Sequence, residues 1–112
     1  MRVAKYELAL ALKSHTKAVN QALAGQPSSQ WISDAQKHLN LARAQLDALK
    51  KLVKAQGSIA ALNTARTAFD SVSSTLRETK AKINSHNPTL KYQLGTFGNY
   101  VGKVNTYLTF VV

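Results

Sequence analysis

Apolar residues recur every three or four positions along most of this chain, the spacing that places side chains on one face of an α-helix. The clearest run, in residues 29–56, consists of Ile32, Ala35, Leu39, Ala42, Leu46, Leu49 and Val53. Residues 58–84 repeat the spacing with Leu62, Ala65, Phe69, Val72, Leu76, Thr79 and Ile83. We therefore predict two long helices whose apolar faces pack together.

The first 24 residues carry a looser version of the same pattern. Its apolar stripe is made of Leu8, Leu12, Val19 and Ala22, and His15 occupies the one remaining stripe position. A histidine on an apolar stripe is more often a core residue than a catalyst. We predict a helix over residues 2–24.

Glycine, proline and serine mark the ends of the predicted helices. Residues 25–29 combine a glycine, a proline and two serines, so the second helix should begin near Ser29. Gly57 and Ser58 supply a glycine stop and a serine cap in minimal space, which predicts that the third helix folds back antiparallel on the second. Pro88 disfavours helical backbone just before it and should end the third helix.

Local propensity and periodicity disagree in residues 88–112. Valine, threonine, tyrosine and phenylalanine crowd residues 100–112 and favour strand, and Gly98-Asn99 suits a hairpin turn. The apolar residues nevertheless keep the helical spacing, at Leu90, Leu94, Phe97, Val101, Val104, Leu108 and Val111. Hairpin pairing would set Leu94 against Lys103, so we predict a helix and keep a C-terminal β-hairpin as the alternative.

These patterns predict one all-α domain over residues 1–112, an antiparallel helical bundle of three long helices and a C-terminal fourth helix. The chain has no cysteine, which excludes disulfides and thiolate metal sites. No apolar run is long enough to span a membrane, and the N-terminus lacks a recognisable secretory signal. We expect the protein in the cytoplasm or within a nucleoprotein or virion assembly.

Three glycines lie close together in the predicted fourth helix. Gly95, Gly98 and Gly102 fall on one side of that helix, with Tyr100 and Tyr107 on the other flank. Their spacing matches neither a dinucleotide-binding nor a Walker phosphate loop. Only two lysines carry charge in residues 88–112, so we predict an interaction surface where a partner backbone approaches closely.

Few residues suggest chemistry. Asp34 and His38 are four residues apart, a spacing that suits two metal ligands or an oriented imidazole, but a local ion pair is the simpler interpretation. His86 is interpreted as a linker residue, and Trp31 as a core anchor rather than a base-stacking residue. With no nucleophile, base and acid to assign, we predict a protein that is not an enzyme and binds no metal or cofactor.

Charge carries the strongest functional signal. Fifteen lysines and arginines face five acidic residues, for a net charge of +10, and no acid follows Glu78. The predicted phosphate-contacting residues are Lys37, Arg43, Lys50, Lys51 and Lys54 on the second helix and Arg66, Arg77, Lys80 and Lys82 on the third. The phosphate backbone of nucleic acid is the common partner of a protein with such an excess of positive charge.

The sequence therefore predicts a non-enzymatic protein that binds nucleic acid largely through phosphates, with little sequence discrimination. Architectural and packaging proteins have this character, and such a chain can form part of an assembly. The alternative is a self-assembling structural subunit, or a protein that docks on an acidic protein partner through the surface of Gly95 and Tyr100. The sequence motifs of base-reading domains are absent.

Overall fold

The computed structural model describes residues 2–111, and helices make up nearly all of that range. The elements are α1 (Arg2–Leu23), α2 (Ser29–Leu52), α3 (Gln56–Asn84), the short 3₁₀ helix η1 (Leu90–Tyr92) and α4 (Gln93–Leu108). No strand occurs among residues 2–111, so the hairpin alternative is wrong and the predicted fourth helix is confirmed.

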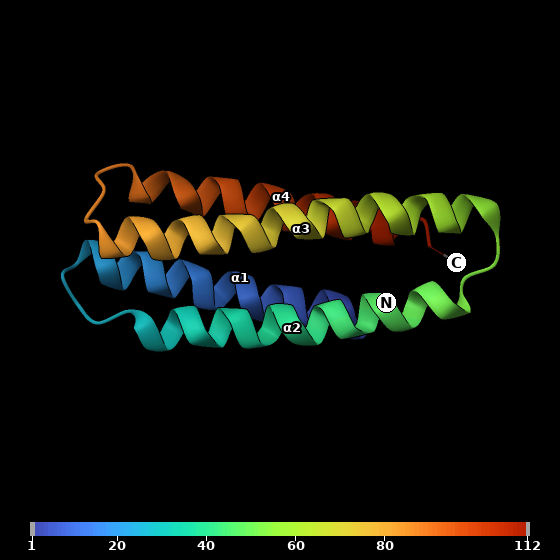
Figure 1. Cartoon of the computed structure of the whole chain (residues 1–112), viewed down its shortest axis with the longest axis horizontal. Coiled ribbons are helices and arrows are strands. Elements are labelled where there is room, and N and C mark those ends of the chain that lie inside the picture. The colour runs from blue at the N-terminus through green and yellow to red at the C-terminus, as the bar shows by residue number, and fades with distance from the viewer. Residues whose placement is uncertain (1, 112) are drawn as a thin grey trace.

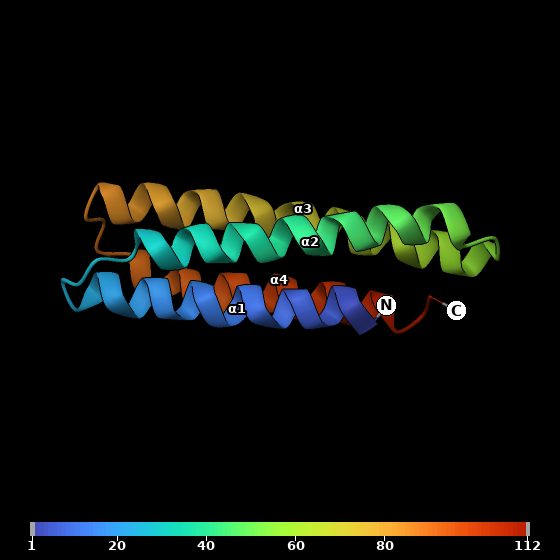
Figure 2. The ribbon, with the colours of Figure 1, turned by 90° about the horizontal axis from the view of Figure 1, so that it is seen from below.

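The four helices lie side by side along the 48 Å axis of a molecule that is 20 Å by 16 Å across (Figure 1). The α1–α2 and α3–α4 connections lie at one end, and the α2–α3 connection lies at the other. The closest packing is between α1 and α2 and between α3 and α4, and α1 also runs beside α4 (Figure 2). The shared core thus sits along the length of a helical bundle.

The apolar positions predicted for α2, α3 and the C-terminal segment form most of this core. Phe69, Phe97, Val104 and Leu108 are at most 1% exposed. The exceptions at the edges of the core are half-buried: Leu49, Val53, Ile83 and Leu94. Trp31 also packs against the core, which confirms its interpretation as an anchor.

The core face of α1 differs from its prediction. Leu12 and Ala22 are only half-buried, whereas Ala4, Ala11 and Ala18 are fully buried. Alanine is a small residue, and α2 presents buried alanines as well, so α1 and α2 meet through short side chains while Leu12 lies at the flank. The buried face therefore includes Leu8, His15 and Val19 of the predicted stripe but is rotated toward the alanines.

The second helix ends earlier than predicted. It stops at Leu52 rather than at residue 56, and Val53 and Ala55 have extended backbone. Gly57 and Ser58 lie in the first turn of α3 and do not act as a stop and a cap between helices. Residues 54–56 carry only one small apolar side chain, that of Ala55, and Ser58 is buried at the start of α3.

The glycines of α4 are not required by packing inside this chain. A Cβ atom built on Gly95 or Gly102 meets nothing within 4 Å, and one built on Gly98 meets only Leu12 Cδ1, at 4.0 Å. The predicted close approach of a neighbouring backbone therefore does not occur within the bundle. Any close approach must come from outside the chain.

Replacing Gly95 and Gly102 with alanine is expected to stabilise the protein by about 0.5–1 kcal/mol each, because the change removes backbone freedom in a helix and meets no neighbour. Urea denaturation of the double variant measures the gain. Gly25→Ala is the matched control: its Cβ also has open space, but its φ of +73° strains an alanine, so this variant should lose stability. A loss in the double variant would contradict the packing described here.

Candidate functional site

A groove of about 400 Å³ lies between α2 and α3, in the half of the bundle nearer the α1–α2 connection. We name it the cationic groove. Its polar lining consists of Lys37, Arg77, Lys80, Ser33, Gln36 and Asn40. The lining contains no carboxylate. Three of the nine predicted phosphate-contacting residues are thus brought together beside neutral hydrogen-bonding groups.

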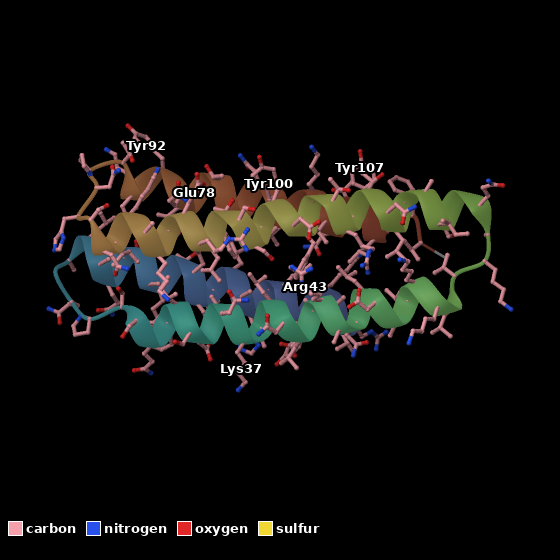
Figure 3. All side chains as sticks on the ribbon, viewed as in Figure 1. Lys37, Arg43, Glu78, Tyr92, Tyr100 and Tyr107 are labelled. Atoms are coloured by element: carbon pink, nitrogen blue, oxygen red, sulfur yellow. The ribbon has the colours of Figure 1, made fainter. Side chains whose placement is uncertain are left out.

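The carboxylates of α2 and α3 are held away from the cationic groove. Asp34 accepts a hydrogen bond of 2.6 Å from Ser14 Oγ on α1. Asp70 and Glu78 line a separate, open groove between α3 and α4. In Figure 3, Lys37 extends outward from α2, whereas Glu78 lies on the α4 side of α3. Negative charge is therefore kept off the groove surface.

Two of the predicted cations form ion pairs across the middle of the α2–α3 interface. Arg43 Nη1 lies 3.5 Å from Asp70 Oδ1, and its Nη2 donates to Ser73 Oγ. Arg66 donates to Asp47, and this hydrogen bond lowers the pKa of Asp47. Because each guanidinium is already paired with a carboxylate, Arg43 and Arg66 contribute less positive potential than a lysine or arginine without an acidic partner.

The remaining predicted cations lie outside the cationic groove. Lys50 and Lys51 occupy the last turn of α2, and Lys54 follows in the connection to α3. All three are exposed. Lys82 points toward α4, where its Nζ donates to Gln93 Oε1 at 3.2 Å. The nine residues therefore form a groove cluster, a pair of salt bridges and a distal lysine group, with Lys82 separate.

The predicted Gly/Tyr surface is divided between two flanks of α4. Gly95 and Gly102 are exposed, and the half-buried Gly98 faces α1. Tyr100 lines the open groove between α3 and α4, and Tyr107 packs partly against the core. The helix period places the glycines and tyrosines on opposite sides, so they do not form one continuous patch.

A polar cluster joins α1 to α2. His38 Nδ1 donates to Glu7 Oε2 at 2.6 Å, and His38 Nε2 lies 3.5 Å from Asp34 Oδ2. The predicted contact between Asp34 and His38 is present, and Glu7 is an additional partner that sequence spacing did not indicate. Ser14 donates to Asp34 rather than to the imidazole, so the cluster pairs no nucleophile with a base. Its geometry suits a structural link between the two helices.

A second polar network is buried where α1, α3 and α4 meet. Thr79 Oγ1 donates to Thr75 O and therefore accepts from His15 Nε2, at 2.7 Å. This tautomer leaves His15 Nδ1 without a proton and without a partner. The ring stacks on Phe97, and burial lowers the pKa of His15 to about 4. His15 is a core residue, as predicted from its stripe position.

The neutral residues of the cationic groove were not predicted from the sequence, although their spacing places them on one helix face. Ser33, Gln36, Lys37 and Asn40 are spaced by three and four residues, which places them on one face of α2. These neutral residues give little signal in the sequence, because polar side chains around a lysine resemble ordinary solvated helix surface.

Among residues 2–111, no group of three or more His, Cys, Asp or Glu side chains is arranged to hold a metal ion. Within the same range, no helix combines the length and apolar character needed to cross a membrane. A scan against protein-family models found no match, and searches of the curated proteins and of the solved structures found no significant match. The net charge and the cationic groove are therefore the features of this protein that indicate a function.

Proposed function

We propose that this chain binds nucleic acid without sequence specificity, through the phosphate backbone, with the cationic groove as its main contact surface. The observation that carries the proposal is the groove lining, where Lys37, Arg77 and Lys80 lie together without a carboxylate. Cationic side chains so placed attract phosphates, and their binding releases the counterions that surround the nucleic acid. The net charge of +10 adds a long-range attraction that favours association with any polyanion.

The other large groove supports phosphate binding less well. The open groove between α3 and α4 is lined by Asp70 and Glu78 as well as by Arg77, which lies on the ridge between the two grooves. Two carboxylates repel a phosphate and offset the single guanidinium. We therefore place the nucleic acid on the α2–α3 side of the molecule.

The dimensions of this side suit a short stretch of one strand. The part of α2 from Ser29 to Asn40 is about 17 Å long at 1.5 Å per residue, which corresponds to about five phosphates at the 3.4 Å axial spacing of one strand. In this proposal the helices form an antiparallel bundle, so that α2 and α3 border the same strand along one face. The distal lysines of α2 extend the field beyond the groove.

The neutral residues of the groove complete the contacts without reading bases. Ser33, Gln36 and Asn40 supply hydroxyl and amide groups that hydrogen-bond phosphate or sugar oxygens. Such contacts carry little sequence information. We propose an architectural or packaging role, in the cytoplasm or within a nucleoprotein assembly.

The triple variant Lys37→Gln, Arg77→Gln and Lys80→Gln tests the proposal. Binding of a fluorescent single-stranded oligonucleotide, followed by anisotropy, should weaken by about 10- to 100-fold at moderate salt, because up to three phosphate contacts are lost. The slope of log K against log salt should fall by about two to three for the same reason. The native chain should show similar affinity for unrelated sequences.

The matched control is Lys13→Gln, Lys91→Gln and Lys103→Gln, which removes the same charge from α1, η1 and α4. This variant should lose much less affinity, since none of its residues lines the cationic groove. Equal losses in both triple variants would show that total charge, and not the groove, governs binding. No salt-sensitive binding by the native chain would overturn the function itself.

Self-assembly is a second candidate, favoured by the open glycines of α4. Gly95 and Gly102 have no neighbour inside the chain that requires a glycine, so a second copy could approach there without displacing a side chain. The flank is also poor in charge, which reduces repulsion between two copies of a protein with a net charge of +10. Light scattering tests this candidate, because a monomer mass at all concentrations contradicts it.

A further inference from the structure

A second pocket, of about 300 Å³, adjoins the cationic groove at the amino end of α2. The two share Ile32, Ser33 and Lys80 in their linings. Residues Gln26 and Pro27 of the α1–α2 connection line the pocket as well. A chain that follows the groove in this direction therefore meets a pocket at the end of the bundle.

The chemistry of this pocket is that of an anion site. Lys80 contributes an ammonium group, Asn84 an amide and Ser29 a hydroxyl, and the lining contains no carboxylate. The pocket lies at the start of a 24-residue helix, where the backbone dipole is positive. The amides of Trp31 and Ile32 already donate to the backbone carbonyl of Ser28. The first two amides of α2, those of Ser29 and Gln30, have no acceptor within the helix.

Ser28 gives a separate indication that the pocket holds a ligand. This residue is 7% exposed and lines the pocket. A serine at this position usually caps its helix through the side-chain oxygen, but Ser28 makes no such bond. Within residues 2–111 its hydroxyl forms no side-chain hydrogen bond, so it is free to bind a ligand at the pocket that Ser28 lines.

We propose that this pocket binds a phosphate monoester, held by the hydroxyl of Ser28, the amides that begin α2 and the ammonium of Lys80. A monoester fits better than a phosphodiester because the α1–α2 connection lines the end of the pocket, where a strand would have to continue. Its second negative charge also strengthens the interaction with the helix end and the lysine. Under the proposed function, the monoester is the terminal phosphate of the strand in the cationic groove. This source of the phosphate rests on the proposed function, whereas phosphate binding by the pocket does not.

Titration of the ¹⁵N-labelled chain with inorganic phosphate, at ionic strength matched with sodium chloride, tests the pocket by NMR. Saturable shifts of the Ser29 and Gln30 amides are expected. Ser28→Ala and Lys80→Gln should each weaken the fitted affinity by about tenfold, the usual effect of losing one charge-assisted hydrogen bond. Lys54→Gln removes the same charge at the other end of α2 and should leave the affinity unchanged. Absent shifts, or native affinity in Ser28→Ala and Lys80→Gln, would overturn the pocket.

A 5′-phosphorylated oligonucleotide, compared with its 5′-hydroxyl counterpart, tests the source of the phosphate. We expect several-fold tighter binding of the phosphorylated strand, and we expect Ser28→Ala to abolish the difference. Equal affinity of the two strands, with the phosphate shifts intact, would overturn the strand end as the source and assign the pocket to a phosphorylated small molecule. If neither strand binds while inorganic phosphate does, the proposed function fails and the pocket stands.

Discussion

Replacing Phe97 with alanine is expected to lower the free energy of unfolding by about 3–5 kcal/mol. The side chain is 0% exposed and its ring stacks on His15, with the ring centroids 4.0 Å apart. The substitution therefore removes a large apolar group and leaves a cavity where α4 meets α1. Urea denaturation followed by circular dichroism measures the loss.

Phe110→Ala is the matched control, because it makes the same chemical change near the end of the same segment. Phe110 is 61% exposed, so this variant should lose less than about 1 kcal/mol. Equal losses in the two variants would contradict the placement of Phe97 in the core. The comparison also tests the helix against the hairpin alternative, in which Phe97 would flank an exposed turn.

Periodicity predicted the C-terminal segment better than local propensity did. Residues 100–112 are rich in strand-forming side chains, yet Phe97, Val101 and Val104 are buried on one face of a helix. Propensities amount to tenths of a kcal/mol per residue, whereas burying one such side chain contributes about 1.5–3 kcal/mol. Burial against the bundle therefore outweighs both the strand propensity and the cost of the three glycines.

Alanine limited the prediction for the first helix. It favours helix both in a core and on a surface, so the burial of Ala4, Ala11 and Ala18 depends on which helix lies opposite them. Leucine gave a stronger signal, but Leu12 is only half-buried and lies beside Gly98 of α4. Which helix packs against α1 determines which of its residues are buried, and this packing is a property of the tertiary structure rather than of the local sequence.

The candidate site, too, could be predicted from the sequence only in part, because the rest depends on tertiary structure. Sequence periodicity identified the basic residues of α2 and α3, but it could not tell which of them carry unpaired charge. Arg43 reaches Asp70 and Arg66 reaches Asp47 only because α2 and α3 are aligned in one particular register. The same register brings Lys37 and Lys80 to one groove. Helix register thus determines where the positive field is concentrated.

Acidification is expected to destabilise the protein through His15. Burial lowers the pKa of His15 to about 4, from 6.5 for an exposed imidazole. As the pH falls below 6.5, the unfolded chain takes up a proton that the folded chain does not, so stability decreases until about pH 4 and this group adds no further loss below it. The shift corresponds to about 3 kcal/mol at about 1.4 kcal/mol per pKa unit. Urea denaturation at a series of pH values measures the loss.

His15→Leu isolates this contribution from the titration of carboxylates over the same range. Leucine fills a similar volume and removes the unpaired Nδ1, while Thr79 still donates to Thr75 O and accepts from Gln93 Nε2. The difference in unfolding free energy between the native chain and this variant should therefore change by about 3 kcal/mol between pH 6.5 and 4. His86→Asn keeps the buried imidazole and should retain the acid loss, since asparagine tolerates the φ of 54° at this exposed turn position. A constant difference for His15→Leu across the range would mean that the imidazole is protonated in the folded protein, against the burial and stacking that hold it neutral between α1 and α4.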